Sequence, residues 1–246
     1  MPSETLPTML IVRPALQTAA DIAVCQAAGW QAAPFSPIAL ETDAAALAGL
    51  NDKMQAADVV FWVSPSAVAL AAPHVAFSDG QIHITVGKGS RAVLADFFRH
   101  EIFCPAAGND SEAVLRLPVW QTLAAGAKIL IIRGHGGRDF LAQKLAESGF
   151  TVETAEVYFR RPQALDWALF ERLQPKAAYI TSSEIVHALF AQVPPRLTQP
   201  LQSLLYLTHH ARIAEALRAA GATRIKQVAG LDVQTLNHAL NGVTNE

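Results

Sequence analysis

The chain has 246 residues, of which 51% are hydrophobic and 16% charged, and its formal net charge is −2. This composition fits one large or two small globular domains and argues against a disordered chain. The sequence has no run of lysine and arginine typical of a nucleic-acid surface, and its apolar stretches are far shorter than the ~20 residues of a membrane span.

Short, continuous apolar runs predict parallel strands that are covered on both faces. In chain order they occupy residues 9–12, 59–63, 82–86, 128–132, 177–180 and 204–207. Alanine- and leucine-rich stretches with helical spacing separate them, and Gly29, Gly149 and Gly221 follow such stretches as helix-ending glycines do. This alternation predicts an α/β fold with mainly parallel sheets flanked by helices.

The two cysteines and the N-terminal residues indicate the cellular compartment of the protein. Cys25 and Cys104 stand in no CxxC pattern and are expected to be reduced, apolar thiols. The start, MPSETLPT, lacks the positive charge and apolar core of a signal peptide, so we expect a cytoplasmic protein.

The chain also contains an internal repeat. The matching segments are 10–30 with 130–150, 59–70 with 177–190 and, more weakly, 109–117 with 231–240. The repeat places Arg13 on Arg133 and Ser64 on Ser182. Its period is too long for a solenoid, whose repeats run ~20–50 residues. We therefore expect two similar domains that act together, with the matched loops as opposing walls of one cleft.

Two extended, proline-bearing segments interrupt the strand–helix alternation at equivalent positions of the repeat, residues 34–42 and 155–162. We interpret them as crossovers between domains. The expected organisation is domain 1 from 1–34 plus 163–246, domain 2 from 43–154, and linker strands at 35–42 and 155–162.

Small, hydroxyl-bearing and basic residues follow most of the predicted strands. Ligands of parallel α/β sheets bind there, and backbone N–H groups at helix N-termini favour anions. The candidates in chain order are Arg13, Ser64, Ser66, Gly87, Ser90, Arg133, Gly134, Arg138, Thr181, Ser182, Ser183 and His210.

Each candidate also has a purely structural interpretation. The serines are ordinary N-caps, and Arg13 and Arg133 would pair with carboxylates. Residues 87–92, GKGSRA, have the form of a dinucleotide loop but lack its acidic partner. His209 and His210 fit a helix start better than a metal site. The chain has no GxSxG elbow, no Walker loop and no convincing pair of catalytic carboxylates, which favours a flexible, anionic substrate.

An ordered set of motifs over about residues 9–240 resembles the uroporphyrinogen-III synthase family. In chain order these motifs are LIVRP, VVFWVSPSAV, ITVGKGSRA, NDSEAVLRL, KILIIRGHGGRDFLAQKLAESGF, TVETAEVYFRRP, AAYITSSEIV and HHARIAEALRAAG. The resemblance implies two α/β domains joined by a two-stranded β-ladder. It also implies a hydro-lyase of haem and sirohaem biosynthesis, which closes hydroxymethylbilane to uroporphyrinogen III with inversion of ring D and loss of water. The family needs no metal and no organic cofactor. A monomer is the simpler expectation, with room for a transient contact with porphobilinogen deaminase.

The resemblance also assigns roles to residues. Tyr158 matches the family's crossover tyrosine, whose hydroxyl would assist departure of the substrate hydroxyl, whereas Ile38 stands at the equivalent position of the other repeat. Ser90 stands where relatives often have threonine, and His210 where they commonly have serine or threonine. The full set expected to bind substrate is Arg13, Ser64, Ser66, Gly87, Ser90, Ser111, Arg133, Gly134, Arg138, Thr181, Ser182, Ser183 and His210.

Tyr158 also fits a buried linker aromatic with a satisfied hydroxyl. For the whole chain, the rivals are a non-catalytic two-domain module that closes on a small anionic ligand, and a nucleotide-dependent enzyme that uses residues 87–92.

Overall fold

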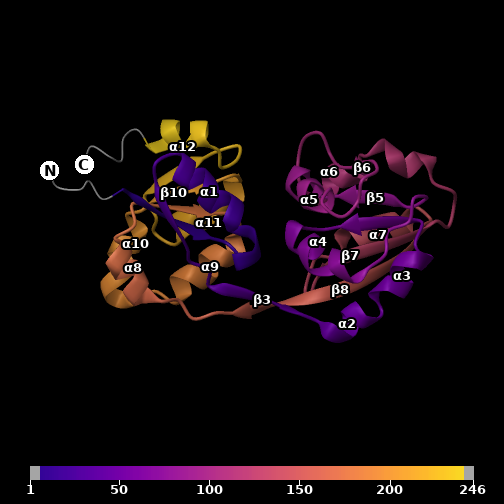
Figure 1. The fold of residues 1–246 in the computed structure, drawn as a ribbon, viewed down its shortest axis with the longest axis horizontal. Coiled ribbons are helices and arrows are strands. Elements are labelled where there is room, and N and C mark those ends of the chain that lie inside the picture. Colours follow the sequence, from indigo (N-terminus) through magenta and orange to yellow (C-terminus); the bar gives the residue numbers. More distant parts are fainter. Residues whose placement is uncertain (1–5, 241–246) are drawn as a thin grey trace. The chain divides into compact units, whose positions relative to one another are not determined.

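The computed structural model describes residues 6–240, so the outermost parts of the expected first domain, 1–5 and 241–246, lie outside the described residues (Figure 1). The chain divides into two compact units. Unit 1 comprises residues 1–39 and 161–246, and unit 2 comprises residues 40–160. Each unit is built around its own sheet.

The sheet of unit 1 has five strands in the order β11-β10-β9-β1-β2, and all neighbouring pairs are parallel. Its strands are β1 (Thr8–Val12), β2 (Gln31–Pro34), β9 (Ala177–Ile180), β10 (Leu205–Thr208) and β11 (Arg224–Gln227). Its helices are α1 (Ala19–Ala27), α8 (Trp167–Leu173), α9 (Ser183–Ala191), α10 (Thr198–Gln202), α11 (Ala211–Ala219) and α12 (Val233–Leu240).

The sheet of unit 2 has the order β3-β8-β7-β4-β5-β6, and from β8 to β6 the neighbouring pairs are parallel. Its strands are β3 (Ile38–Thr42), β4 (Val59–Trp62), β5 (Ile82–Thr85), β6 (Ile102–Phe103), β7 (Lys128–Gly134) and β8 (Thr151–Pro162). Its helices are α2 (Ala44–Ala48), α3 (Leu50–Ala56), α4 (Pro65–Ala71), α5 (Lys88–Leu94), α6 (Ser111–Leu115) and α7 (Phe140–Glu147).

The order of strands in the two sheets follows the internal repeat of the sequence. Read from β2, the first sheet runs β2-β1-β9-β10-β11, and read from β8 the second runs β8-β7-β4-β5-β6. The repeated segments thus supply β1 and β7 at one position and β9 and β4 at the next. The weakest match of the repeat falls on α6 and α12, which follow β6 and β11.

Strand alternation explains the cores. In β4, Val60 and Trp62 belong to one buried cluster, whereas Val59 and Phe61 belong to another, because successive side chains point to opposite faces of a sheet. Unit 1 repeats this pattern: Met9 and Ile11 join one cluster, while Leu10 and Val12 are also fully buried. Burial of both faces is why these strands read as continuous apolar runs.

Cys25 and Cys104 are both free thiols, as expected from their spacing. Cys25 lies in the core of unit 1, where its thiol contacts the Met9 sulfur at 3.6 Å. Burial, with a smaller contribution from the charge of Asp21, raises the pKa of Cys25 to about 12.

The chain passes between the units twice, through β3 and β8, which lie side by side (Figure 1). The Asp43 N–H donates to the Val157 carbonyl and the Gln163 N–H donates to the Pro37 carbonyl, so the two strands run in opposite directions. β2 stops at Pro34 and β3 starts only at Ile38, whereas β8 continues without a break from Thr151 to Pro162. Among the described residues, no helix has the length and apolar character needed to cross a membrane.

Candidate functional site

Most of the candidate residues of unit 2 lie at one edge of its sheet. Because β8, β7, β4 and β5 are adjacent and parallel, the loops that follow β7, β4 and β5 come together there with the later part of β8. The residues brought to this edge are Ser64, Ser66, Gly87, Ser90, Arg133, Gly134, Arg138 and Tyr158. Ser111 begins α6, just beyond Asn109, which lies against Gly87.

Tyr158 is the centre of this group. Its side chain is almost fully buried, with 2% of the residue exposed, and it belongs to the same cluster as Trp62 and Val157. Its hydroxyl oxygen lies 3.3 Å from the Ser64 hydroxyl and accepts a hydrogen bond from Arg160 Nη2 at 3.2 Å. The phenol is therefore a buried ring whose polar end meets two polar side chains.

The ring of Tyr158 lies directly over Gly134. A Cβ atom at position 134 would lie 2.5 Å from the Tyr158 Cζ, so no side chain fits there. A register shift between Arg133 and Gly134 produces this arrangement, because Arg133 pairs with Glu156 and Gly134 then pairs with Tyr158, passing over Val157. Such a bulge re-aims a side chain at a strand end.

Ser64 is the N-cap of α4, and its hydroxyl accepts the Ala67 N–H at 3.0 Å. The capping interpretation of this residue is therefore correct. The cap also fixes the Ser64 hydroxyl next to Tyr158, so one side chain both starts a helix and contacts the phenol.

Arg133 is held inside unit 2. Its guanidinium pairs with Asp139 at 2.7 Å and Glu156 at 3.2 Å and donates to the Arg138 carbonyl, and only 11% of its side chain is exposed. The Arg138 residue itself is exposed. Of these two arginines, Arg133 orders the glycine-rich loop, while Arg138 has the accessible surface.

His135 is a residue that sequence reasoning missed. Its Nε2 lies 3.0 Å from Asp43 and its Nδ1 3.3 Å from Glu156, while its ring stacks on Phe159 with centroids 3.8 Å apart. Hydrogen bonds from the Ala46 N–H and from His135 hold the pKa of Asp43 below its usual range. A histidine inside a glycine-rich loop was the available signal, but its partners come from two other strand regions.

The remaining candidates of unit 2 differ in accessibility. Ser66 and Ser90 are buried, with 4% and 1% exposed, and among the described residues the Ser90 hydroxyl has no hydrogen-bond partner. Gly87 precedes α5 with extended backbone, and a Cβ there would lie 3.1 Å from the Asn109 Cβ. The absence of a side chain at Gly87 lets these loops pack closely.

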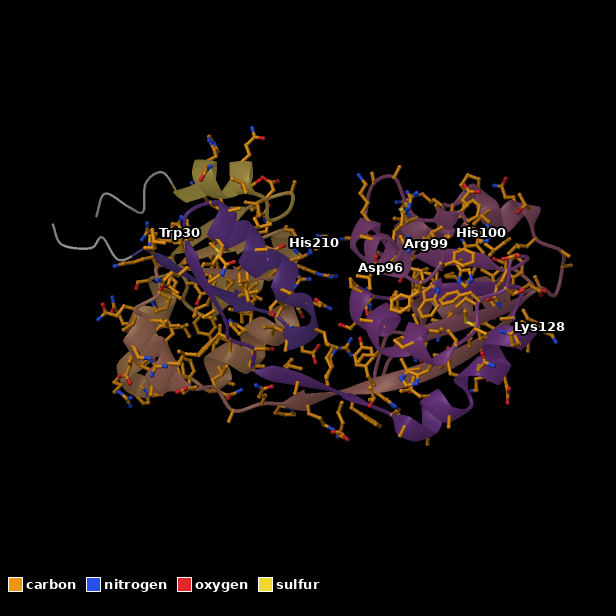
Figure 2. All side chains as sticks on the ribbon, viewed as in Figure 1. Trp30, Asp96, Arg99, His100, Lys128 and His210 are labelled. Atoms are coloured by element: carbon orange, nitrogen blue, oxygen red, sulfur yellow. The ribbon has the colours of Figure 1, made fainter. Side chains whose placement is uncertain are left out.

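The candidates of unit 1 gather in the same way beyond β1, β9 and β10. Thr181, Ser182 and Ser183 follow β9, and the Ser183 hydroxyl donates to the Arg212 carbonyl at 3.5 Å, joining the starts of α9 and α11. Ser182 and His210 are the N-cap residues of these helices, and neither side chain makes a capping bond. Figure 2 labels His210 beside the start of α11.

Arg13 is paired, like its counterpart Arg133. Its guanidinium contacts Asp21 at 2.7 Å and donates to Gln17 at 2.8 Å. Among the described residues, three buried atoms near this edge have no hydrogen-bond partner: Arg13 Nε, Thr208 Oγ1 and His209 Nδ1. Burial, followed by the charges of His210, Arg13 and Arg212, lowers the pKa of His209 to about 4.

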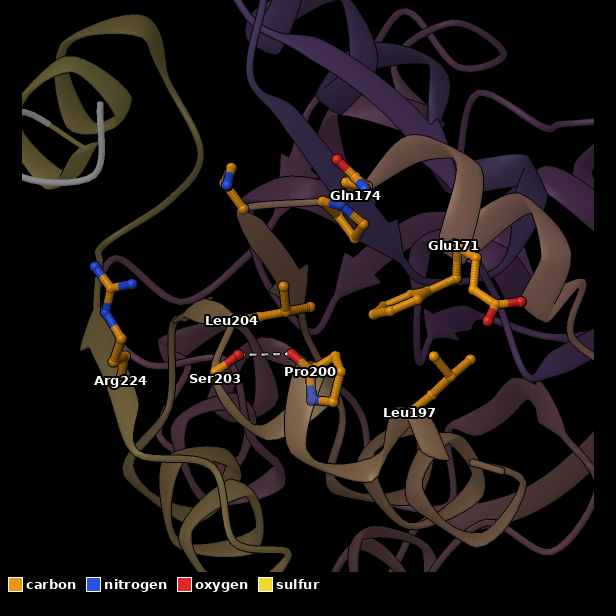
Figure 3. A pocket seen from close by; sticks show the side chains of 10 residues that line it. Glu171, Gln174, Leu197, Pro200, Ser203, Leu204 and Arg224 are labelled. Atoms are coloured by element: carbon orange, nitrogen blue, oxygen red, sulfur yellow. Dashed lines mark hydrogen bonds between the residues drawn. The ribbon is translucent and has the colours of Figure 1, made fainter. Parts of the chain in front are cut away.

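A cavity of about 640 Å³ lies elsewhere in unit 1 (Figure 3). Lys176, Leu204 and Arg224 line it at the amino ends of β9, β10 and β11, the edge opposite to the candidate loops. None of the predicted site residues lines this cavity. Within residues 6–240, no group of three or more His, Cys, Asp or Glu side chains is arranged to hold a metal ion.

Comparisons with known proteins show the family of the chain. The family model "HEM4: Uroporphyrinogen-III synthase HemD" matches residues 19–232. The Salmonella typhimurium uroporphyrinogen-III synthase is 29% identical over 95% of this chain and 99% of its own length. The Escherichia coli enzyme is 27% identical over 70% of this chain and 76% of its own length.

Two solved structures share the fold. A mutant uroporphyrinogen III synthase of Thermus thermophilus has a TM-score of 0.57 and 16% identity, over 98% of this chain and 100% of its own. The Helicobacter pylori uroporphyrinogen-III synthetase has a TM-score of 0.52 and 12% identity, over 96% of this chain and 99% of its own. The fold class is therefore as predicted, two mainly parallel sheets flanked by helices.

Fold and comparisons together define a two-unit α/β hydro-lyase of tetrapyrrole biosynthesis. The chain belongs to the uroporphyrinogen-III synthase family, and the family implies hydroxymethylbilane as its substrate. This membership decides against a non-catalytic ligand-binding module.

Proposed function

We propose that the chain converts hydroxymethylbilane to uroporphyrinogen III with inversion of ring D, and that Tyr158 is its catalytic residue. One observation carries the assignment of Tyr158: its hydroxyl lies beside Ser64 at the loop edge of the unit 2 sheet, with its ring seated on Gly134. Ile38, at the equivalent position of the repeat, offers no such group.

The proposed chemistry begins at the terminal hydroxymethyl group of the bilane. The Tyr158 hydroxyl gives its proton to the departing hydroxyl oxygen, the C–O bond breaks and water leaves, while the adjoining pyrrole supplies the electrons that form an azafulvene cation. The cation is attacked at the substituted carbon of ring D, and the spiro intermediate rearranges to the macrocycle. The proton released when the macrocycle forms restores the phenol.

Tyr158 is only 2% exposed, which limits how the substrate reaches it. The leaving hydroxyl meets the phenol at this small exposed area, or after a neighbouring side chain moves aside. Such a buried position excludes bulk water from the cation once it has formed.

We propose that loops of both units bind the carboxylate arms of the bilane. In unit 1 the first N–H groups of α9 and α11 are left uncapped by the side chains of Ser182 and His210, so they are available to an anion. In unit 2 the exposed Arg138 adds positive charge. Arg13 and Arg133 already pair with carboxylates and chiefly order their loops.

Holding the bilane in one folded geometry is the main contribution to catalysis in this proposal, because ring inversion depends on which carbon of ring D faces the cation. We further propose that the chain acts as a monomer and contacts porphobilinogen deaminase only transiently. Sedimentation of the chain alone and with that enzyme tests both statements, and a stable dimer or complex would contradict them.

The test of Tyr158 is the Tyr158→Phe variant, assayed with freshly made hydroxymethylbilane. Loss of a general acid is expected to lower kcat by about 100-fold or more. Tyr206→Phe is the matched control, because it removes a buried tyrosine hydroxyl that donates to the Leu201 carbonyl at 2.9 Å, away from the candidate loops of unit 2. An unchanged rate in Tyr158→Phe would make Tyr158 a structural residue of the linker.

Identification of the isomer tests the overall reaction. In an assay coupled to porphobilinogen deaminase, the products are oxidised and separated into type I and type III porphyrins. The proposal expects type III. Type I alone, which forms when the activated chain closes without inversion, would overturn the proposed reaction.

A further inference from the structure

The hydroxyl of Tyr158 has two close polar neighbours, and counting donors and acceptors shows which way its proton points. Arg160 Nη2 can only donate, so the Tyr158 oxygen is the acceptor of that 3.2 Å hydrogen bond. The phenol proton is therefore not used by Arg160. It is directed either to Ser64 or to a substrate.

The Ser64 hydroxyl already accepts the Ala67 N–H at 3.0 Å as a helix cap. Its own proton is free to be donated, and Tyr158 Oη is 3.3 Å away. Either hydroxyl can be the donor in this contact; when Ser64 donates together with Arg160, the Tyr158 oxygen uses its two lone pairs and keeps its proton for a third partner. This arrangement presents the phenol as a hydrogen-bond donor to the substrate.

Arg160 is well placed to hold this arrangement. Its Nη1 donates to the His135 carbonyl at 3.3 Å, and its guanidinium carbon lies 5.3 Å from the centroid of the Tyr158 ring. The backbone of His135 is itself fixed, because its backbone N–H donates to the Tyr158 carbonyl at 2.8 Å. Two residues along β8, Arg160 lies on the same face of the strand as Tyr158, whereas Arg161 lies on the other.

We propose that Arg160 is a positioning residue for the reaction: it directs the Tyr158 proton toward the leaving hydroxyl and stabilises the phenolate formed when that proton is transferred. The inference rests on the catalytic role proposed for Tyr158. A fixed positive group beside the oxygen on which charge develops favours the transition state over the ground state.

The proton balance of the step is complete. The O–H bond of Tyr158 breaks, its proton joins the bilane hydroxyl oxygen, and the C–O electron pair leaves with water. The phenolate keeps its hydrogen bond to the Arg160 guanidinium until ring closure releases a proton that restores the phenol. No oxidant, reductant or further reactant is needed.

A double-mutant cycle tests the inference. Steady-state kinetics with fresh hydroxymethylbilane are measured for the unmodified chain, Arg160→Met, Tyr158→Phe and the double variant. Arg160→Met is expected to lower kcat about 10-fold, the lower end for a charge-assisted hydrogen bond on an exposed residue, and to change KM less than about 3-fold. In the Tyr158→Phe background the same change should cost nothing more, because Arg160 acts through the hydroxyl.

Three further variants sharpen the test. Arg160→Lys keeps the charge and should recover part of the lost kcat, and Arg160→Gln gives a second neutral variant if Arg160→Met folds poorly. Arg161→Met removes the same charge from the opposite face of β8 and should leave kcat unchanged.

Distinct results would overturn the inference. A raised KM with unchanged kcat in Arg160→Met would mean that Arg160 binds a substrate carboxylate. A full additional loss in the double variant would mean that it acts independently of Tyr158, and this failure leaves the role of Tyr158 intact. An unchanged rate in Tyr158→Phe would remove both proposals together.

Discussion

His83 makes the stability of unit 2 depend on pH. Its side chain is fully buried, and its Nδ1 accepts the Trp62 indole N–H at 3.1 Å. Nε2 therefore carries the proton of the neutral ring, and among the described residues it has no hydrogen-bond partner. Phe98 and Phe77 pack against the ring with centroids 4.3 and 5.3 Å away. Protonation of Nδ1 would both break the Trp62 bond and place a charge in this aromatic cluster.

The size of the effect follows from the shifted pKa. Burial lowers the pKa of His83 to about 4, against about 6.5 in the unfolded chain. Between these values the unfolded state binds the proton and the folded state does not, so stability falls as the pH falls from 6.5 toward 4. From pH 7.5 to pH 5.0 the loss amounts to about 2 kcal/mol in the free energy of unfolding.

The assay compares the unmodified chain with His83→Gln, which cannot titrate in this range but keeps an acceptor for Trp62. Urea unfolding of both proteins at pH 7.5 and 5.0 should show their difference in free energy of unfolding shrinking by about 2 kcal/mol at the lower pH. His100→Gln is the control, because the His100 side chain is 59% exposed and its Nε2 pairs with an exposed Asp79. If the difference in free energy of unfolding between the unmodified chain and His83→Gln stays constant with pH, the reasoning is refuted.

Two further substitutions test the packing around the candidate loops. Gly134→Ala would push the Tyr158 ring aside by about 1 Å, which should cost about 1–3 kcal/mol of stability and lower kcat by about 100-fold. Thermal unfolding measures the stability and steady-state turnover measures kcat. Gly80→Ala is the control, because its added methyl meets nothing within 4 Å. Equal turnover in the two variants would contradict the close approach at Gly134. Arg13→Met should cost about 3 kcal/mol in urea unfolding, because it leaves the Asp21 carboxylate, 11% exposed, without its cation, and adding Asp21→Asn should recover part of this loss. A loss below about 1 kcal/mol for Arg13→Met would show that the pair contributes little.

The sequence predicted the central strands because they are buried on both faces. Residues 177–180 coincide with β9, and the other five apolar runs match β1, β4, β5, β7 and β10 to within a residue or two at their ends. The strands that escaped prediction are β2, β6 and β11, which lie at or next to a sheet edge. β2 and β11 carry exposed polar residues such as Gln31 and Gln227, and β6 has only two residues, so none forms an apolar run.

The candidate site was less accessible to sequence reasoning. Periodicity places Ser64 and Arg133 at strand ends, and parallel pairing then brings their loops to one edge. Whether Arg133 faces a ligand or a carboxylate depends on Asp139 and Glu156, whose positions follow from the loop conformation and the register shift in β7. The spacing of Tyr158 and Arg160 was a usable signal, since alternate residues of a strand share a face, but it required knowing that this segment is one unbroken strand.

The pairing of β3 with β8 has a consequence for the order of folding. Unit 2 is one continuous stretch of chain inserted between the two pieces of unit 1, so the neighbours β1 and β9 are separated by the whole of residues 40–160. An unfolded insert of that length would add to the entropic cost of bringing β1 and β9 together. Once unit 2 has folded, β3 and β8 hold its two ends side by side and remove most of that cost. During synthesis residues 40–160 are also made before β9, so unit 2 can fold first and hold the two pieces of unit 1 close together while unit 1 assembles.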